Sequence, residues 1–318
     1  MRRELRIAVA GAGAVGSVFG GKLAAAGHDV LLVGRDPHMA EVARAGLRIS
    51  GVFGDTHARP KVATDLADAA GAYDAVLITV KSHATREVAR RLATWRPAPA
   101  LAVSLQNGLG NAEAIAEELP RSRVLAGRVI FGAVVEAPGF VDVTVNARPV
   151  AIGPLRPDGS AADVARGLAA AIDASGIPCE PVASTEPLLW EKVLYNCGLN
   201  PLGALHGLTY GEVVASERTR AKLDAAIREG WHVARAAGIS LRWRDADEFL
   251  DYFYSTLLPP TAAHRSSMRQ DLEAGRRTEI DAISGAIARA GARLGIATPI
   301  ADELVAAVRA AEATARPR

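Results

Sequence analysis

Lys192, Asn196 and Asn200 recur at intervals of four residues in the stretch LLWEKVLYNCGLNP (188–201). In a helix this spacing places the three side chains on one face, one above the other. The residues around them are mostly apolar, so this face would be largely buried, and a buried polar group without a partner is costly. The stripe therefore predicts a site for a polar ligand, in which the lysine can donate a proton. The alternative is structural: the lysine would reach to water and the amides would satisfy backbone groups.

Lysine is rare in this chain. Lys and Arg together number 37, and only five are lysines, at positions 22, 61, 81, 192 and 222. Because arginine does not release its proton at ordinary pH, a lysine inside a motif is a candidate acid. Lys81 and Lys192 fall inside motifs, whereas the other three are interpreted as surface residues.

The string GAGAVG places three glycines in a G-x-G-x-x-G pattern. An apolar strand precedes it, and a segment with helical spacing follows and stops at Gly27. In this context the glycines give a tight turn, close approach of the backbone to a pyrophosphate, and close contact between helix and strand. The first N–H groups of the helix then face the phosphates. A plain glycine-rich turn is the weaker alternative. The loop thus predicts a dinucleotide site formed by Gly11, Gly13, Ala14, Val15 and Gly16.

The end of the second strand, HDVLLVGRD (28–36), bears on which dinucleotide is bound. NAD-binding proteins usually carry an acidic residue here, which holds the ribose hydroxyls. Gly34 removes bulk and Arg35 offers a cation, which suits the 2′-phosphate of NADP. Asp36 supports the competing interpretation, because it could serve as the acidic ribose ligand one or two positions late. The sequence favours NADP, with Arg35 as a ligand.

Two further polar residues follow predicted strands. Lys81 comes after VLITV, and Asn107 lies in QNGLGN after LAVSL. The carboxyl ends of parallel strands form the edge at which doubly wound sheets bind ligands. Either residue alone could be a solvated strand end or part of a simple turn. Behind a nucleotide loop, the two together favour a role in binding.

The patterns predict an α/β fold: an N-terminal Rossmann-type dinucleotide-binding domain, residues 1–183, followed by an all-α C-terminal domain, residues 184–318. In the first part, short apolar strands alternate with amphipathic helices. The strands at 73–81 and 99–108 are continuously apolar, which suits a parallel sheet covered on both faces. Further strands, some of them antiparallel at the far edge of this sheet, are predicted at 124–139, 140–145 and 148–155.

After about Ser184 the strand patterns give way to helical spacing. Pro201 lacks an N–H and is expected to kink or end the first of these helices just after Asn200. The terminal AAEATARPR (310–318) is predicted to be a frayed, solvated end. Helices are predicted within 188–196, 219–238, 245–257 and 278–295.

Composition limits the functional class. The chain has 318 residues, of which 49% are hydrophobic and 23% charged, as is ordinary for a globular protein of two domains. A net charge of +2 is too small to predict a nucleic acid or an anionic membrane as the partner. Cys179 and Cys197 are the only cysteines, so neither a disulfide framework nor a metal site is expected, and the protein is predicted to be cytoplasmic. The N-terminus superficially resembles a secretory signal, but the glycine spacing explains its residues better.

These motifs together resemble the ketopantoate reductase (2-dehydropantoate 2-reductase) family. The resemblance rests on GAGAVG, TVK, QNG, WEKVLYNCGLNP and SSMRQDLEAGRRTEID, in this order, and runs over nearly the whole chain. The last two stretches are specific to the family and lie in the helical domain. The resemblance implies NADPH-dependent reduction of 2-dehydropantoate to pantoate, in pantothenate and coenzyme A biosynthesis. The substrate would be a small 2-oxo acid, and a monomer or a homodimer fits this architecture.

The resemblance also implies the roles of catalytic and cofactor-binding residues. Lys192 would be the catalytic lysine, which donates a proton to the carbonyl oxygen of the substrate. Glu279 would lie near the nicotinamide and the catalytic centre. Asn107 would help to bind both cofactor and substrate, and Lys81 would lie by the adenosine phosphate of the cofactor.

On the substrate side, the resemblance implies that Asn196 and Asn200 bind polar groups and that Ser267 holds the carboxylate. His264 stands where the family has a substrate-binding asparagine, three residues before that serine, and could still donate to a hydroxyl. Arg269 stands where an apolar residue is usual. These departures put the identity of the substrate in question more than the reaction.

Alternatives therefore stay open. Ser267 could be an ordinary helix cap, and Glu279 an ordinary surface acid. The nearest rival function is NADPH-dependent reduction of another 2-oxo acid, which the two departures motivate. A more distant rival is a nucleotide-sensing protein without turnover, against which the lysine–glutamate pair argues, because a sensor needs no proton donor.

Overall fold

The computed structural model describes residues 4–69, 71–157 and 159–315. By contacts within the chain it divides into two compact units. Unit 1 contains the residues up to Gln106 together with Asn111–Thr185, and unit 2 contains Asn107–Gly110 together with the residues from Glu186 onward. The four-residue loop between Gln106 and Asn111 thus belongs to unit 2, although both of its flanks belong to unit 1. In the part of the chain described, no helix has the length and hydropathy needed to cross a membrane.

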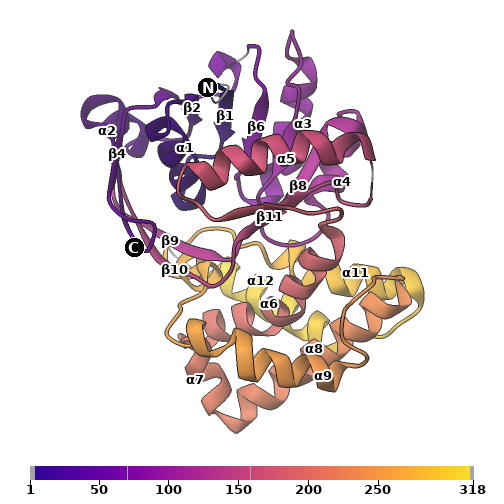
Figure 1. The fold of residues 1–318 in the computed structure, drawn as a ribbon. Coiled ribbons are helices and arrows are strands. Elements are labelled where there is room, and N and C mark those ends of the chain that lie inside the picture. The colour runs from indigo at the N-terminus through magenta and orange to yellow at the C-terminus, as the bar shows by residue number, and fades with distance from the viewer. Residues whose placement is uncertain (1–3, 70, 158, 316–318) are drawn as a thin grey trace. The chain divides into compact units, whose positions relative to one another are not determined.

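Unit 1 is built on an eight-stranded sheet with the strand order β12-β11-β8-β7-β6-β1-β2-β5 (Figure 1). The pairs from β8 through β5 are all parallel, and β11 is antiparallel to β8. The central strands are apolar and buried throughout, as a parallel sheet covered on both faces requires. The strands are β1 (Arg6–Ala10), β2 (Asp29–Val33), β5 (Lys61–Ala63), β6 (Ala75–Ile78), β7 (Ala102–Ser104), β8 (Val124–Arg128), β11 (Val150–Gly153) and β12 (Cys179–Pro181).

Helices connect these strands. They are α1 (Ala14–Ala25), α2 (His38–Ala45), α3 (Thr85–Thr94), α4 (Asn111–Ala116) and α5 (Gly159–Ala174), with short 3₁₀ turns at Ala67–Ala69, Ser82–Ala84 and Arg121–Arg123. The alternation of parallel strands and helices, together with the helical unit 2, confirms the predicted fold class.

A second sheet corrects the prediction for residues 131–145. Four strands in the order β4-β3-β10-β9 form a sheet of their own, rather than an extension of the main one. They are β3 (Leu47–Gly51), β4 (Thr56–Ala58), β9 (Phe131–Ala137) and β10 (Phe140–Asn146). Helix α1 contacts strands of both sheets and buries the apolar Val141 and Val143 of β10. Of the predicted segments, β8 and β11 lie in the main sheet, and β11 alone of these two is antiparallel to its neighbour, because β9 leaves the main sheet after β8 to pair with β10.

Lys22 also differs from its interpretation as a surface residue. It lies on α1 with 6% of its surface exposed, and its Nζ donates a hydrogen bond to the carbonyl oxygen of Phe53 at 2.5 Å. Burial lowers the pKa of this ammonium. Lys61 and Lys222 do form exposed ion pairs, with Asp29 and Glu303.

From Glu186 onward, the described residues of unit 2 form helices joined by turns and short loops. Helix α6 contacts α7, α8, α10, α11 and α12 and is the centre of the unit (Figure 1). The helices are α6 (Glu186–His206), α7 (Tyr210–Ala215), α8 (Glu217–Ala236), α9 (Ala246–Tyr252), α10 (Ser267–Glu273), α11 (Ser284–Leu294) and α12 (Pro299–Thr314). A π-helical turn (Phe253–Leu257) and 3₁₀ turns (Pro259–Thr261, Ile280–Ala282) complete it.

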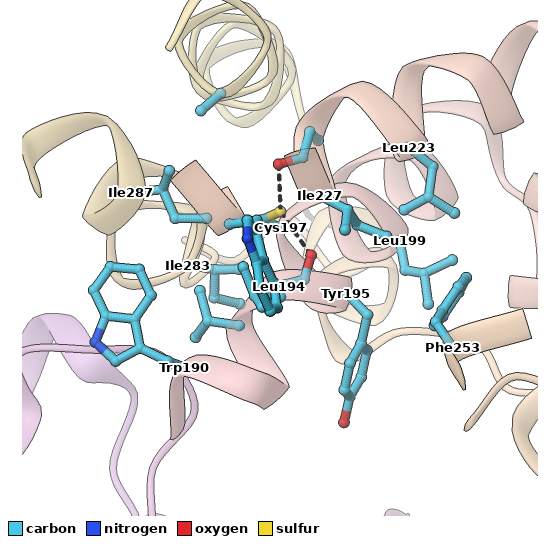
Figure 2. Close-up of a cluster of buried hydrophobic side chains, with 14 of the residues drawn as sticks. Trp190, Leu194, Tyr195, Cys197, Leu199, Leu223, Ile227, Phe253, Ile283 and Ile287 are labelled. Atoms are coloured by element: carbon cyan, nitrogen blue, oxygen red, sulfur yellow. Dashed lines mark hydrogen bonds between the residues drawn. The ribbon is translucent and has the colours of Figure 1, made fainter. Parts of the chain in front are cut away.

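The apolar residues of α6 form the core of unit 2. Figure 2 shows Trp190, Leu194 and Cys197 of α6 packed with side chains from neighbouring helices. The Cys197 thiol contacts the carbonyl oxygens of Leu194 and Ala226 at 3.0 and 3.6 Å, drawn as dashed lines. Cys197, Trp190, Trp231 and Tyr195 are all buried in this core.

Helix α6 does not end after Asn200, contrary to one form of the prediction for Pro201. It continues through Pro201 to His206. A proline at position 201 cannot donate to the carbonyl oxygen of Cys197, four residues earlier. Ser284 Oγ donates to that oxygen instead, at 2.8 Å. The hydroxyl from α11 therefore supplies the hydrogen bond that the helix itself lacks.

The predicted frayed end is wrong for residues 310–314, which lie in α12. Glu312 in this segment accepts a hydrogen bond from the backbone N–H of Thr278 at 2.6 Å. The helix is held by this contact and by buried residues on its inner face, such as Leu304 and Val308. Residues 316–318 lie outside the described part of the chain.

Candidate active site

The glycine loop connects β1 to α1. Gly11 has φ +111°, and a Cβ on it would lie 2.5 Å from the backbone N of Val80. A Cβ on Gly16 would lie 2.3 Å from the Gly11 carbonyl oxygen. A Cβ on Gly13, by contrast, would meet nothing within 4 Å. Gly11 and Gly16 are thus required by packing within the protein, whereas the backbone at Gly13 faces open space that a ligand can approach.

The first turn of α1 presents unused donors at the same place. Its first intrahelical hydrogen bond runs from the Ser17 N–H to the Gly13 carbonyl, at 2.8 Å. The N–H groups of Ala14, Val15 and Gly16 precede that bond, as the first donors of a helix do. No side chain caps this end of the helix, because its N-cap is Gly13. Donors without a protein cap at a helix N-terminus suit a phosphate.

The TVK motif (79–81) makes hydrogen bonds to the glycine loop. Thr79 Oγ1 donates to the carbonyl oxygen of Gly11 at 2.8 Å, and the Thr79 N–H donates to Ala10 at 2.9 Å. Lys81 follows at the carboxyl end of β6 and precedes a 3₁₀ turn, with its side chain half-buried. The motif therefore places Lys81 at the same sheet edge as the glycine loop.

The three residues that follow β2 have different environments. Gly34 packs closely, because a Cβ there would lie 2.9 Å from that of Ala12 and 3.0 Å from Met39 Sδ. The Asp36 carboxylate accepts a hydrogen bond from the backbone N–H of Ala40 at 2.9 Å and so supports the start of α2. Arg35 is exposed between them.

A buried polar network that no sequence pattern predicted joins the loops that follow β6 and β7. Gln106 Nε2 donates to the Val80 carbonyl oxygen at 2.8 Å and to Thr85 Oγ1 at 2.6 Å. Thr85 Oγ1 in turn donates to Asn111 Oδ1 at 2.9 Å. Gln106 directly precedes Asn107, so the network fixes the point at which the Asn107–Gly110 loop begins. A polar side chain directly after an apolar strand was the only signal in the sequence.

Within unit 2, the Asn107–Gly110 loop meets the polar stripe of α6. Lys192 Nζ donates to Asn107 Oδ1 at 2.5 Å. Leu109 N–H donates to the Ala282 carbonyl oxygen at 2.8 Å, and Gly108 has φ +88° with no room for a Cβ against that same carbonyl. Residues 85 positions apart in the chain are thus brought into direct contact.

The two amides of the stripe are buried. Asn196 is 6% exposed and Asn200 2%. Asn200 Oδ1 accepts a hydrogen bond from the Tyr210 hydroxyl at 2.7 Å. Among the described residues, no hydrogen bond to the Asn196 side chain occurs within 3.5 Å. The stripe therefore combines an ammonium, an oriented amide and an amide with unused hydrogen-bonding capacity.

His264 lies beside this stripe. Its ring meets the Tyr210 ring edge to face, with centroids 5.1 Å apart, and its carbonyl oxygen accepts the Tyr210 N–H at 3.1 Å. Burial lowers the pKa of His264, and the nearby charge of Lys192 lowers it further. Tyr210 was not predicted. A T-x-x-E pattern, realised as a capping box between Thr209 and Glu212, does mark it as the first residue of a helix.

The structure does not support the structural alternatives for Ser267 and Glu279, which were a helix cap and a surface acid. The cap of α10 is Ser266, whose Oγ accepts the Arg269 N–H at 3.1 Å, so Ser267 is not the cap. Glu279 is 7% exposed and is not a surface acid. Its carbonyl oxygen accepts the Ala282 N–H at 3.0 Å, in the same turn that holds the Asn107–Gly110 loop.

Arg269 is engaged elsewhere. Its Nε donates to Glu273 one turn along α10 at 2.7 Å. Burial raises the pKa of the Cys179 thiol to about 12 and also raises that of Cys197, which disfavours the thiolate form of both. In the described part of the chain, no group of three or more metal-ligating side chains comes together.

The fold and the glycine loop define a Rossmann-type dinucleotide-binding protein with a helical second unit. Residues 7–157 match the family model for ketopantoate reductase PanE/ApbA, and residues 185–312 match the model for its C-terminal part. The chain belongs to the PanE/ApbA ketopantoate reductase family, as the motifs predicted.

Individual relatives agree over nearly the full length. The 2-dehydropantoate 2-reductase of Halobacterium salinarum is 36% identical, with 97% of this chain and 99% of the relative covered. That of Aquifex aeolicus is 33% identical, with 97% of both chains covered. A PanE/ApbA family ketopantoate reductase from Ralstonia eutropha superposes with a TM-score of 0.83 at 34% identity, over 97% of this chain and 99% of the other. D-mandelate dehydrogenase with NADH and anilino(oxo)acetate superposes with a TM-score of 0.87 at 27% identity, over 98% and 99%.

Proposed function

We propose that the protein reduces 2-dehydropantoate to pantoate with NADPH. The observation that carries the proposal is the hydrogen bond from the Lys192 ammonium to Asn107, on a buried helix face that also carries two amides. Full-length similarity to several proteins named 2-dehydropantoate 2-reductase supports the same reaction.

In this proposal Lys192 is the general acid. Reduction of a ketone builds negative charge on its oxygen, and a cation that can give up a proton stabilises that charge and then neutralises it. The bound nicotinamide supplies the hydride. Asn107 holds the ammonium through its Oδ1 atom, which fixes the position of the proton donor before the substrate arrives. Glu279, buried in the turn that anchors the same loop, is the second catalytic residue of the proposal.

The substrate is assigned to the side chains around the stripe. Asn196 and Asn200 bind its polar groups, Ser267 its carboxylate, and His264 a hydroxyl. The buried position of both amides supports this assignment, since a buried amide whose hydrogen-bonding groups are only partly used within the protein is costly unless a ligand uses the rest.

A nicotinamide dinucleotide is the cofactor, and we assign NADP in particular. Unit 1 binds it, with the phosphates at Gly13 and the first turn of α1 and with Lys81 near the adenosine phosphate. Arg35 is exposed where a 2′-phosphate would lie, whereas the Asp36 carboxylate is already used by Ala40. An acid occupied in this way is a poorer ligand for ribose hydroxyls.

A second candidate function is reduction of a different 2-oxo acid. The edge-to-face pair of Tyr210 and His264 beside the stripe favours it, because aromatic rings select among substrate side chains. Similarity to D-mandelate dehydrogenase, solved with anilino(oxo)acetate, supports an aromatic substituent as one such side chain.

Oxidation of NADPH and NADH by the purified protein, followed by absorbance across a panel of 2-oxo acids, tests these proposals. The panel should include 2-dehydropantoate, shorter branched 2-oxo acids and phenylglyoxylate. The proposal requires 2-dehydropantoate to give the highest kcat/KM. A higher value for another acid would move the assignment to the second candidate, and no turnover with any of them would leave only a nucleotide-binding role.

A further inference from the structure

We propose that Tyr210 is a positioning residue that orients the Asn200 amide with its N–H donors toward the substrate, so that the site selects the carboxylate form of a 2-oxo acid over its neutral amide. The inference rests on the proposed function of the same site.

The first observation is the hydrogen bond from the Tyr210 hydroxyl to Asn200 Oδ1 at 2.7 Å. Tyr210 is 7% exposed, and burial strongly raises the pKa of its phenol, so that the hydroxyl keeps its proton. A phenol has a single proton to donate. Because Asn200 Oδ1 accepts this hydrogen bond, the oxygen of the amide faces the phenol and its NH₂ group points away from it.

The opposite orientation of the amide is disfavoured. It would place the Asn200 NH₂ against the phenolic oxygen and leave the hydroxyl proton in need of another acceptor. Among the described residues, the Tyr210 hydroxyl has no hydrogen-bonding partner besides Asn200. A buried donor without an acceptor is costly. The phenol therefore selects one of the two amide orientations.

The second observation is that Tyr210 is itself held firmly. Its N–H donates to the His264 carbonyl oxygen at 3.1 Å, and the Gly211 N–H donates to Ala262 at 2.8 Å. The capping box of Thr209 and Glu212 fixes the turn from which Tyr210 projects. A phenol anchored at its backbone and at its ring edge can impose an orientation on its neighbour.

The consequence is a set of donors on one helix face. Asn200 offers N–H groups two turns along α6 from the ammonium of Lys192. A 2-oxo acid offers acceptor oxygens on its ketone and its carboxylate. In this inference Ser267 contacts one carboxylate oxygen and the Asn200 donors contact the other. A primary 2-oxo amide has an NH₂ group in place of one of the carboxylate oxygens, and this group would oppose the Asn200 donors.

The test uses the 2-oxo acid that the wild type reduces fastest and the primary amide of that acid. Tyr210→Phe keeps the ring and removes the proton, so both amide orientations become accessible. We expect KM for the acid to rise by about tenfold, because this is roughly the affinity that is lost when the donor of one hydrogen bond to the substrate is no longer held in position. The preference for acid over amide in kcat/KM should fall by a similar factor. Tyr254→Phe is the matched control, since it removes a phenol bonded to Asp224 in the same unit and should leave the preference unchanged.

Asn200→Asp provides a second variant. One oxygen of the new carboxylate can accept the hydrogen bond from Tyr210, and the other then presents an acceptor to the substrate in place of the N–H donors. It should reduce the amide with a higher kcat/KM than the acid. An unchanged preference in a folded Tyr210→Phe protein, or an Asn200→Asp protein that still prefers the acid, would overturn the inference. Neither outcome bears on the proposed function, which is tested separately by the turnover of the wild type across the panel of 2-oxo acids.

Discussion

Ser284 Oγ donates a hydrogen bond to the Cys197 carbonyl oxygen at 2.8 Å, and this is the carbonyl that Pro201 leaves without its helical partner. The bond ties α11 to the middle of α6, within the chain segment that carries Lys192 and both amides. The turn just before Ser284 holds the Asn107–Gly110 loop through Ala282. The proline in α6 and the position of Asn107 are therefore connected through one hydroxyl group.

Ser284→Ala should lower the free energy of unfolding by about 1–3 kcal/mol, because it leaves a buried carbonyl oxygen without a donor. Pro201→Ala restores the N–H that can reach the same oxygen, so in that background Ser284→Ala should cost less than half as much. Urea unfolding of the two single variants and the double variant measures the coupling. Strictly additive losses would show that Ser284 and Pro201 act independently.

Arg35→Asp should reduce the use of NADPH far more than that of NADH. The exposed guanidinium can pair with a 2′-phosphate, whereas a carboxylate repels it and can accept from ribose hydroxyls instead. Kcat/KM for both cofactors, measured with wild type and variant, gives the selectivity directly. Equal kcat/KM values of the wild type for the two cofactors would contradict the assignment of NADP. So would a variant in which kcat/KM falls by the same factor for both.

The stability of the protein should fall as the pH drops below about 6.5, the unfolded pKa of histidine. His38 Nδ1 accepts the Gly139 N–H at 3.0 Å, so this ring is neutral, and burial lowers its pKa. His264 is shifted in the same direction. A lowered folded pKa means that the unfolded chain binds protons first, so stability is present above pH 6.5 and is lost as the pH falls toward the folded pKa.

Unfolding midpoints in urea between pH 7.5 and 5.5 check this. His38→Asn keeps an acceptor for Gly139 but does not titrate, so its midpoint should fall less over this range than that of the wild type. Identical slopes for the two proteins would assign the effect to other groups.

The local features of the site could be predicted because each depends on a short stretch of sequence. The four-residue spacing of Lys192, Asn196 and Asn200 needs only a helix, and the glycine spacing needs only a strand followed by a helix. The buried environment of Glu279 could not be predicted in this way, because it depends on the packing of α12 and the turn around it. Family resemblance alone pointed to that residue.

The missed features are set by contacts between different helices and strands. Helix α6 passes through Pro201 because Ser284, 83 positions later, supplies a donor. Strands β9 and β10 leave the main sheet because β3 offers a free edge and α1 an apolar face. Tyr210 belongs to the site only because α7 folds back to Asn200. No pattern within a single segment contains this information.

The most direct test of the account is the turnover of Lys192→Met, which keeps the apolar stem and removes the ammonium that meets Asn107. Loss of the general acid should reduce kcat by about 10²–10⁴-fold. The affinity for NADPH, measured by fluorescence titration, should change little, because the glycine loop lies in unit 1. Lys192→Arg should not restore the rate, since a guanidinium carries the charge but gives up no proton. A folded Lys192→Met protein that keeps kcat within a few-fold of the wild type would contradict the account and leave the polar stripe of α6 with a structural role.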